Sequence, residues 1–245
     1  MKRSFFHPMR NAVSAALTAA AIVVAASTQA SILYFDEFTS IDDPIETALV
    51  NLGLSFTEVT NETDFNNEIT SNPFDLVIFL EESLPRLSAR TNVETFINGG
   101  GKAIYNSFTP GAFASVFDAV AGTVNSTNVT VTDPVLAAGL GSASFSLVNP
   151  TFGVFSVELT AASGGVTGGT LGGGSAVIFG NDGRTIMNGF LTETFPSLDD
   201  EVRFYENEIS LLMGTTPVPL PASLPLAAAG LGLMAAVARS RRARA

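Results

Sequence analysis

Acidic, amide and hydroxyl side chains follow three apolar runs that the sequence offers as strands. They are Asp36, Glu37, Glu81, Glu82, Asn106 and Ser107. In an open α/β sheet the carboxyl ends of neighbouring parallel strands meet, and ligands bind at that edge. Oxygen donors of this kind suit Ca²⁺ or Mg²⁺. The pattern raises the hypothesis of a cation site serving a metal-assisted hydrolase. The alternative is that Asp42 and Asp43 cap the first expected helix and that the other acidic side chains face water.

The residue types that are missing limit the chemistry further. The chain has no cysteine, and its one histidine, His7, lies near the amino terminus. Thiol nucleophiles, Ser-His-Asp triads and His-ligated zinc are therefore unavailable to residues 31–245. Ser107 lacks the flanking glycines of a nucleophile elbow, and the nearest candidate base, Lys102, begins the same strand. We expect no cofactor apart from the Ca²⁺ or Mg²⁺ considered above. The sequence therefore favours a protein that is not an enzyme.

Alternating strands and helices must position these side chains. Apolar runs and amphipathic spacing predict strands at 31–35, 54–60, 76–80 and 102–108, and helices at 43–52, 64–69, 88–98 and 109–122. The alternation favours a parallel sheet with helices on both faces, with the first four strands in the order 2-1-3-4. In this order the carboxyl ends of the first and third strands are neighbours, so the candidate metal-coordinating side chains would lie there.

The second half of the sequence departs from this alternation. We expect a strand at 128–132, a short helix opening at Asp133, and a surface loop in the glycine-rich stretch 161–175. Two β-rich runs around the turn signal 181–183 predict a hairpin. A closing helix follows at 199–213, starting at Asp199 or Asp200.

Three stretches carry a resemblance to a known fold. "DLVIFLEE", "FINGGGKAIYNS" and "AVIFGNDGRTIMNGFL" before a last helix resemble the class I glutamine amidotransferase-like fold, especially its non-catalytic branches. The resemblance implies a flavodoxin-like, mostly parallel sheet with helices on both faces and a late β-hairpin. In amidotransferases the turn after the fourth strand carries a cysteine nucleophile, with a histidine elsewhere. Asn106, Ser107 and Phe108 stand at that turn here, so the resemblance supports the fold and argues against the activity.

The charge is unevenly distributed along the chain. Residues 31–214 hold five basic residues against all twenty-three acidic ones, which gives a net charge of −18 rather than the −11 of the whole chain. Such a surface repels nucleic acid, so no nucleic-acid partner is expected. A solvated acidic exterior and attraction of cations are both compatible with it.

The amino terminus is typical of a secretory signal peptide. Lys2, Arg3 and Arg10 precede a run of small apolar residues, and the stretch ends in Thr28-Gln29-Ala30. The small residues Thr28 and Ala30, at positions −3 and −1, predict cleavage by signal peptidase between Ala30 and Ser31. The alternative is an uncleaved anchor helix, for which the run is short.

The carboxyl terminus resembles the VPLPA form of the PEP-CTERM sorting signal of Gram-negative bacteria. The motif is Val218, Pro219, Leu220, Pro221 and Ala222, followed by an apolar run at 224–238 and an arginine cluster. The resemblance implies processing by an exosortase near the motif. We expect the apolar run to form a transmembrane helix, held transiently in the inner membrane before the domain reaches the cell surface or the extracellular space. The alternative is a plain carboxyl-terminal anchor.

The sequence thus predicts a signal peptide at 1–30, one α/β domain at 31–214 and a sorting segment at 215–245. Exosortase and signal peptidase are the expected processing partners, and an extracellular polysaccharide or surface matrix is the expected surrounding. The expected role is a non-catalytic structural or binding component. Convergence of Asp36, Glu81 and Asn106 on one point would favour the metal-assisted hydrolase instead.

Overall fold

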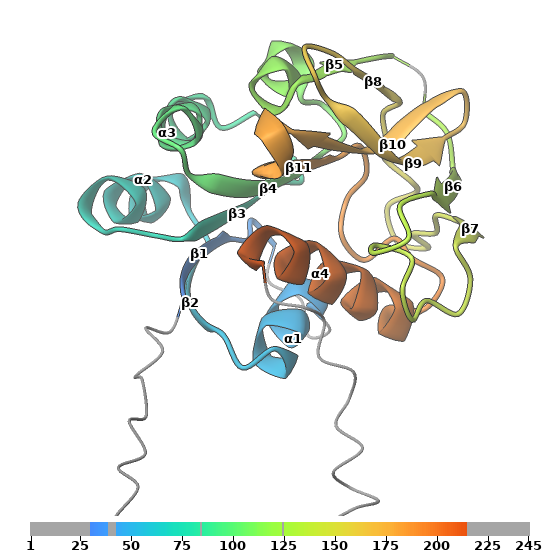
Figure 1. Ribbon diagram of the computed structural model, residues 1–245, viewed down its shortest axis with the longest axis horizontal. Coiled ribbons are helices and arrows are strands. Elements are labelled where there is room, and N and C mark those ends of the chain that lie inside the picture. The colour runs from blue at the N-terminus through green and yellow to red at the C-terminus, as the bar shows by residue number, and fades with distance from the viewer. Residues whose placement is uncertain (1–29, 39–42, 84, 124, 215–245) are drawn as a thin grey trace, which may run out of the picture.

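One sheet runs through the residues that the computed structural model describes, which are 30–38, 43–83, 85–123 and 125–214. Its main order is β2-β1-β3-β4-β11-β10-β9-β6-β7, and helices cover both faces (Figure 1). The strands are β1 (Ser31–Phe35), β2 (Ser55–Val59), β3 (Leu76–Glu81), β4 (Lys102–Ser107), β5 (Ala119–Ala121), β6 (Asn128–Val131), β7 (Ser144–Ser146), β8 (Leu159–Ala161), β9 (Val166–Leu171), β10 (Gly174–Gly180) and β11 (Thr185–Asn188). The helices are α1 (Pro44–Asn51), α2 (Glu62–Ser71), α3 (Leu87–Asn98) and α4 (Leu198–Met213), with 3₁₀ helices η1 (Gly111–Phe117) and η2 (Asn181–Gly183).

The parallel half of the sheet confirms the expected fold class. Strands β2, β1, β3 and β4 lie side by side in the predicted order, and β11 joins β4 in parallel. Strand β10 returns antiparallel to β11, which is the expected late hairpin. In its turn Asn181 and Asp182 adopt left-handed backbone conformations, with φ of 53° and 58°. Asn and Asp tolerate this region better than most residues do.

The surface loop expected at 161–175 is wrong, because most of this stretch is strand. Strand β9 pairs with both β10 and β6. A Cβ on Gly168 would lie 2.7 Å from the ring of Phe179. Glycine therefore allows β9 to pack directly against an aromatic side chain of the neighbouring strand. The glycine-rich composition of β9, which is typical of flexible linkers, here allows close packing against β10.

Two expected helices differ from the prediction: one is shorter, and at the other position the described structure has a turn. The helix at 109–122 is only η1, because Asp118 has a left-handed backbone (φ 55°) that ends it. The Asp118 carboxylate accepts a hydrogen bond from the Asn181 backbone nitrogen at 2.7 Å, and β5 follows. At Asp133 the side chain caps a turn, accepting from the amide of Leu136 at 3.0 Å, and no helix follows.

Capping residues place the two helices that frame the acidic end of the sheet. Asp43 Oδ1 accepts from the amides of Ile45 (2.8 Å) and Glu46 (3.0 Å), and Pro44 occupies the first turn of α1, as expected. Helix α4 starts one residue earlier than predicted, because Ser197 is its cap and accepts from the Asp200 amide. The capping side chains satisfy amide groups that the first helical turn leaves free.

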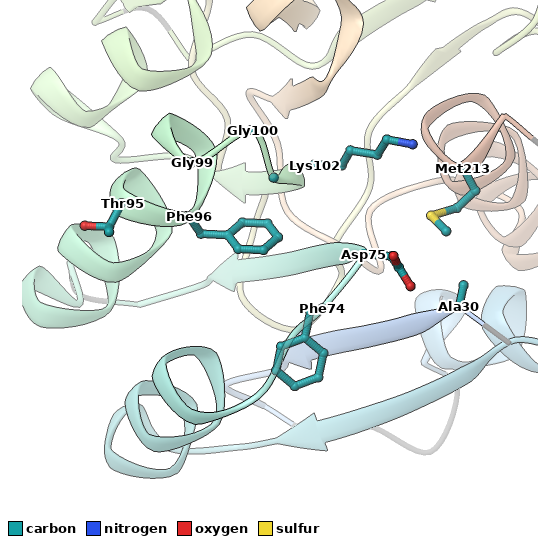
Figure 2. A pocket seen from close by; sticks show the side chains of 10 residues that line it. Ala30, Phe74, Asp75, Thr95, Phe96, Gly99, Gly100, Lys102 and Met213 are labelled. Atoms are coloured by element: carbon teal, nitrogen blue, oxygen red, sulfur yellow. The ribbon is translucent and has the colours of Figure 1, made fainter. Parts of the chain in front are cut away.

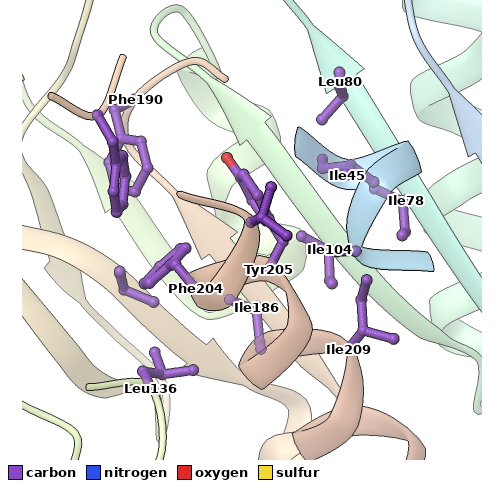
Figure 3. Packing of buried hydrophobic residues seen from close by; sticks show 14 of the residues in the cluster. Ile45, Ile78, Leu80, Ile104, Leu136, Ile186, Phe190, Phe204, Tyr205 and Ile209 are labelled. Carbon is purple, nitrogen blue, oxygen red and sulfur yellow. The ribbon is translucent and has the colours of Figure 1, made fainter. Parts of the chain in front are cut away.

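Each face of the sheet has its own apolar core. Helices α1 and α4 lie on one face, the α1–α4 face, where Leu80 and Ile104 pack with α4 (Figure 3). Tyr34 belongs to the same core. Helices α2, α3 and η1 lie on the other, the α2–α3 face, and Phe79 and Tyr105 pack there. Successive strand residues alternate between these cores, which decides where the polar residues beyond the strand ends point.

Candidate functional site

Strand alternation divides the predicted metal ligands between the two faces. Asp36, Glu82 and Asn106 each follow, by two positions, a residue buried on the α1–α4 face. Glu37, Glu81 and Ser107 follow, by two positions, residues buried on the α2–α3 face. Side chains two apart along a strand share a face. Strand alternation therefore assigns Glu81 to the opposite face of the sheet from Asp36 and Asn106, and the metal-assisted hydrolase stays a prediction.

On the α2–α3 face the two carboxylates are bound by arginines of the segment leading into α3 and of α3 itself. Arg86 forms an ion pair with Glu37, and Arg90 forms one with Glu81. The Tyr105 hydroxyl also donates to Glu81, at 2.6 Å. Both carboxylates are thus neutralised by residues that sequence reasoning did not connect to them.

On the α1–α4 face four acids lie close enough to interact electrostatically. This acidic cluster consists of Asp36, Asp43, Glu82 and Glu193. Burial, with repulsion from Asp43, Glu58 and Glu193, raises the pKa of Asp36 from 3.8 to about 6. Burial, with repulsion from Asp36, Glu193 and Asp43, raises the pKa of Glu82 from 4.5 to about 7. Thr192 donates to Glu82 and partly offsets the rise. At neutral pH the cluster therefore binds protons more readily than separate surface acids do.

A chain of buried hydrogen bonds lies beside this cluster, between the sheet and α4. Asn106 Nδ2 donates to the Tyr205 hydroxyl at 2.7 Å, and Asn188 Nδ2 donates to Asn106 Oδ1 at 2.9 Å. Asn188 Nδ2 also lies 3.2 Å from Glu208 Oε2. All four side chains are buried, and burial raises the pKa of Glu208 to about 8. This network fixes Asn106 inside the protein rather than presenting it to a ligand.

Sequence reasoning missed Asn188 and Glu208, although a signal for each was present. Asn188 ends the apolar run of β11, and Glu208 follows Tyr205 by three positions on the inward face of α4. A polar residue at helical or strand spacing within an apolar face indicates a buried hydrogen-bonding group.

No group of three or more His, Cys, Asp or Glu side chains suited to hold a metal occurs within 30–38, 43–83, 85–123 and 125–214. Asp36 and Glu82 share the acidic cluster, whereas Glu37 and Glu81 are engaged by arginine. Binding of Ca²⁺ or Mg²⁺ stays a prediction for titration to decide.

The turn after β4 is closed by its own contacts. Ser107 is fully buried, and its hydroxyl oxygen accepts from the Thr109 amide at 3.1 Å. The ring of Phe108 lies against Phe155, with centroids 5.0 Å apart. Lys102 begins β4, one full strand away from Ser107. A serine without a neighbouring base is a poor nucleophile.

The two ends of the domain bear on the predicted processing sites. Ser31 is the first residue of β1, and its nitrogen donates to Asp75 Oδ2 at 2.9 Å. The sorting motif Val218–Ala222 lies outside the described residues. The expectation of a transmembrane helix is corrected, because no helix in the described part of the chain is long and apolar enough to cross a membrane. The segment 224–238, for which that helix was expected, lies outside the described residues.

Comparisons with known proteins support the fold alone. No family model and no curated protein sequence matches the chain. A solved structure from Thermoplasma acidophilum, named for GMP synthase, is 14% identical, covers 77% of this chain and 96% of its own, and gives a TM-score of 0.52. A glutamine amidotransferase from Thermotoga maritima is 12% identical over 77% of this chain and 91% of its own, with a TM-score of 0.50. A cytoplasmic protein from Salmonella typhimurium LT2 is 12% identical over 76% and 99%, with a TM-score of 0.50. The described chain therefore has the class I glutamine amidotransferase-like fold.

Proposed function

We propose that this protein is an exported, non-catalytic component of the cell surface or extracellular matrix, released by signal peptidase and sorted by an exosortase. The resemblance of Val218–Ala222 and the following segment to PEP-CTERM signals supports the sorting step. The signal-peptide pattern before Ser31 supports export. The domain between them then acts by binding or by forming part of an assembly.

The turn after β4 carries the non-catalytic part of the proposal. The amidotransferase-like fold places a nucleophile there in catalytic members, by the resemblance stated above. In this chain Asn106 and Ser107 are both 0% exposed, and each is hydrogen-bonded within the domain. The Ser107 hydroxyl is thus turned into the domain, and it has no neighbouring base among the described residues to activate it. The non-catalytic part of the proposal therefore rests on the buried side chains at the turn after β4, the place of the nucleophile in catalytic members of the fold.

The intact mass of the protein isolated from its native cells tests this proposal. We expect a mature chain that begins at Ser31 and ends near Val218–Ala222, in the surface or extracellular fraction. A control variant, Pro219→Ala with Pro221→Ala, is expected to keep the full tail. A wild-type chain that still ends at Ala245 would overturn the sorting step, and ammonia release from glutamine by the purified protein would overturn the non-catalytic assignment.

A further inference from the structure

A cavity of about 690 Å³ lies at the amino ends of the central strands, at the opposite end of the sheet from the acidic cluster. It is open to solvent, and Figure 2 shows the side chains around it. Its walls include the rings of Phe74 and Phe96, the charged groups of Asp75 and Lys102, and Ala30 and Met213 at the two ends of the domain. A volume of this order falls within the range of small-ligand sites, and its lining is more polar than is usual for an apolar ligand.

Among the basic residues that the structure describes, Lys102 alone has no ion pair with an acid and no hydrogen bond to a carbonyl. The other four basic residues are engaged: Arg86 with Glu37, Arg90 with Glu81, Arg203 with Glu206, and Arg184 with the carbonyls of Ile97 and Gly101. The Lys102 ammonium makes no ion pair with any residue that the structure describes, and its side chain extends along the cavity toward Met213 (Figure 2). In a domain of net charge −18, an unpaired cation in the cavity wall indicates an anionic ligand.

The proposed processing would place a second ammonium group next to Asp75 of the cavity wall. The Ser31 nitrogen donates to Asp75 Oδ2 at 2.9 Å, and the Asp75 nitrogen donates to the Ser31 carbonyl at 2.8 Å. Cleavage after Ala30, as proposed above, converts the Ser31 nitrogen into an ammonium group and removes Ala30 from the wall. Asp75 then holds this ammonium in place by a charge-assisted hydrogen bond. The mature cavity carries two ammonium groups and one carboxylate.

The two aromatic rings narrow the ligand class. Phe74 precedes β3 and Phe96 lies in the last turn of α3, and both rings are half-buried beside the cavity. A flat ring offers its face to the C–H groups of a sugar, whereas a cation beside it can bind a carboxylate. We propose that the cavity binds a uronate unit of an acidic polysaccharide. The inference rests on the proposed export, since it places the ligand outside the cell.

The acidic character of the domain is compatible with this ligand. At physiological ionic strength the Debye length is about 8 Å, so acids at the far end of the sheet are largely screened from the cavity. Lys102 and the Ser31 ammonium act at contact distance, where screening is weakest. Among the residues that line the cavity, Asp75 is the one acid, and the Ser31 nitrogen donates to it.

Calorimetric titration with trigalacturonate tests the proposal on the protein purified from its native cells. The fully methyl-esterified trimer is the matched ligand control, because it keeps the rings and loses the charges. Lys102→Gln and Lys102→Arg are the paired variants, and thermal unfolding checks that both fold. We expect binding of the acid, about tenfold or more weaker binding by Lys102→Gln, partial rescue by Lys102→Arg, and little binding of the ester.

Equal binding of acid and ester, no binding of the acid, or equal binding by Lys102→Gln would each overturn the proposal. Intact mass, measured on the same sample, keeps the two ideas apart. A chain that retains Ala30 and still binds trigalacturonate through Lys102 contradicts the proposed processing but supports the site. A chain that is processed as proposed but does not bind trigalacturonate supports the processing and contradicts the ligand site.

Discussion

Replacing Glu208 by glutamine is expected to stabilise the domain at neutral pH. Glu208 is 0% exposed, and burial raises the pKa of its carboxyl group from 4.5 to about 8. Its Oε2 lies 3.2 Å from Asn188 Nδ2, whereas its Oε1 has no hydrogen-bond partner among the residues described. The group must stay protonated in the folded protein, but in the unfolded chain it ionises at ordinary acidic pH.

The size of the effect follows from this difference in pKa. The raised value means that the folded state binds the proton more tightly, so stability is fully present below about pH 4.5 and is lost as pH rises toward 8. Each pH unit in that window lowers the free energy of unfolding by about 1.4 kcal/mol. At pH 7, about 2.5 units into the window, the loss is about 3 kcal/mol. Glutamine cannot ionise and removes this loss.

Urea unfolding of both proteins between about pH 4.5 and 8 measures the effect. We expect the Glu208→Gln variant to match the wild type at the acidic end and to gain about 3 kcal/mol at pH 7. Glu206→Gln is the control, because Glu206 lies on the same helix and pairs with Arg203 at 2.5 Å. That variant is expected to lose a little stability. A Glu208→Gln gain that is absent, or that is the same at every pH, would refute the reasoning.

Three further predictions concern the acidic cluster, β9 and the strand ends. In Asp36→Asn the pKa of Glu82, followed by NMR, is expected to fall below about 7, because one negative neighbour is lost; an unchanged titration would show that the two acids are not coupled. Gly168→Ala is expected to lower the free energy of unfolding by about 1–3 kcal/mol, because its Cβ meets Phe179, whereas Gly173→Ala, with its nearest atom 3.7 Å away, is expected to change it little; equal effects would contradict the packing argument. Titration with millimolar Ca²⁺ or Mg²⁺ tests the predicted cation site: because arginines engage Glu37 and Glu81, any saturable heat is expected to be lost in Glu82→Gln and kept in Glu37→Gln, and no heat from the wild type would end the metal hypothesis.

Local sequence signals were sufficient for the parallel half of the fold. The apolar runs of β1 and β3, the Asp43 cap and the hairpin turn at 181–183 each act within a few residues, so spacing alone predicts them. The glycine-rich strand β9 could not be predicted this way. Its strand conformation depends on Phe179 and on pairing with β6, which lies far away in the sequence.

The candidate site shows the same limit. Glu81 and Glu82 are adjacent in sequence, and strand alternation alone sends them to opposite faces, which the sequence could have predicted. The pairing of Glu81 with Arg90 was less accessible, because it depends on how α3 packs over the sheet. The cavity around Lys102 depends on bringing together the starts of three strands and the end of α4, which no local pattern specifies.

The place of β1 within the sheet leaves almost no tolerance for trimming at the amino end. Residues Ile32–Phe35 are at most 1% exposed, and β1 lies between β2 and β3. Cleavage only a few residues beyond Ala30 would therefore remove an interior strand and leave two open edges. The residues that separate a tolerated amino-terminal truncation from a destructive one are therefore very few.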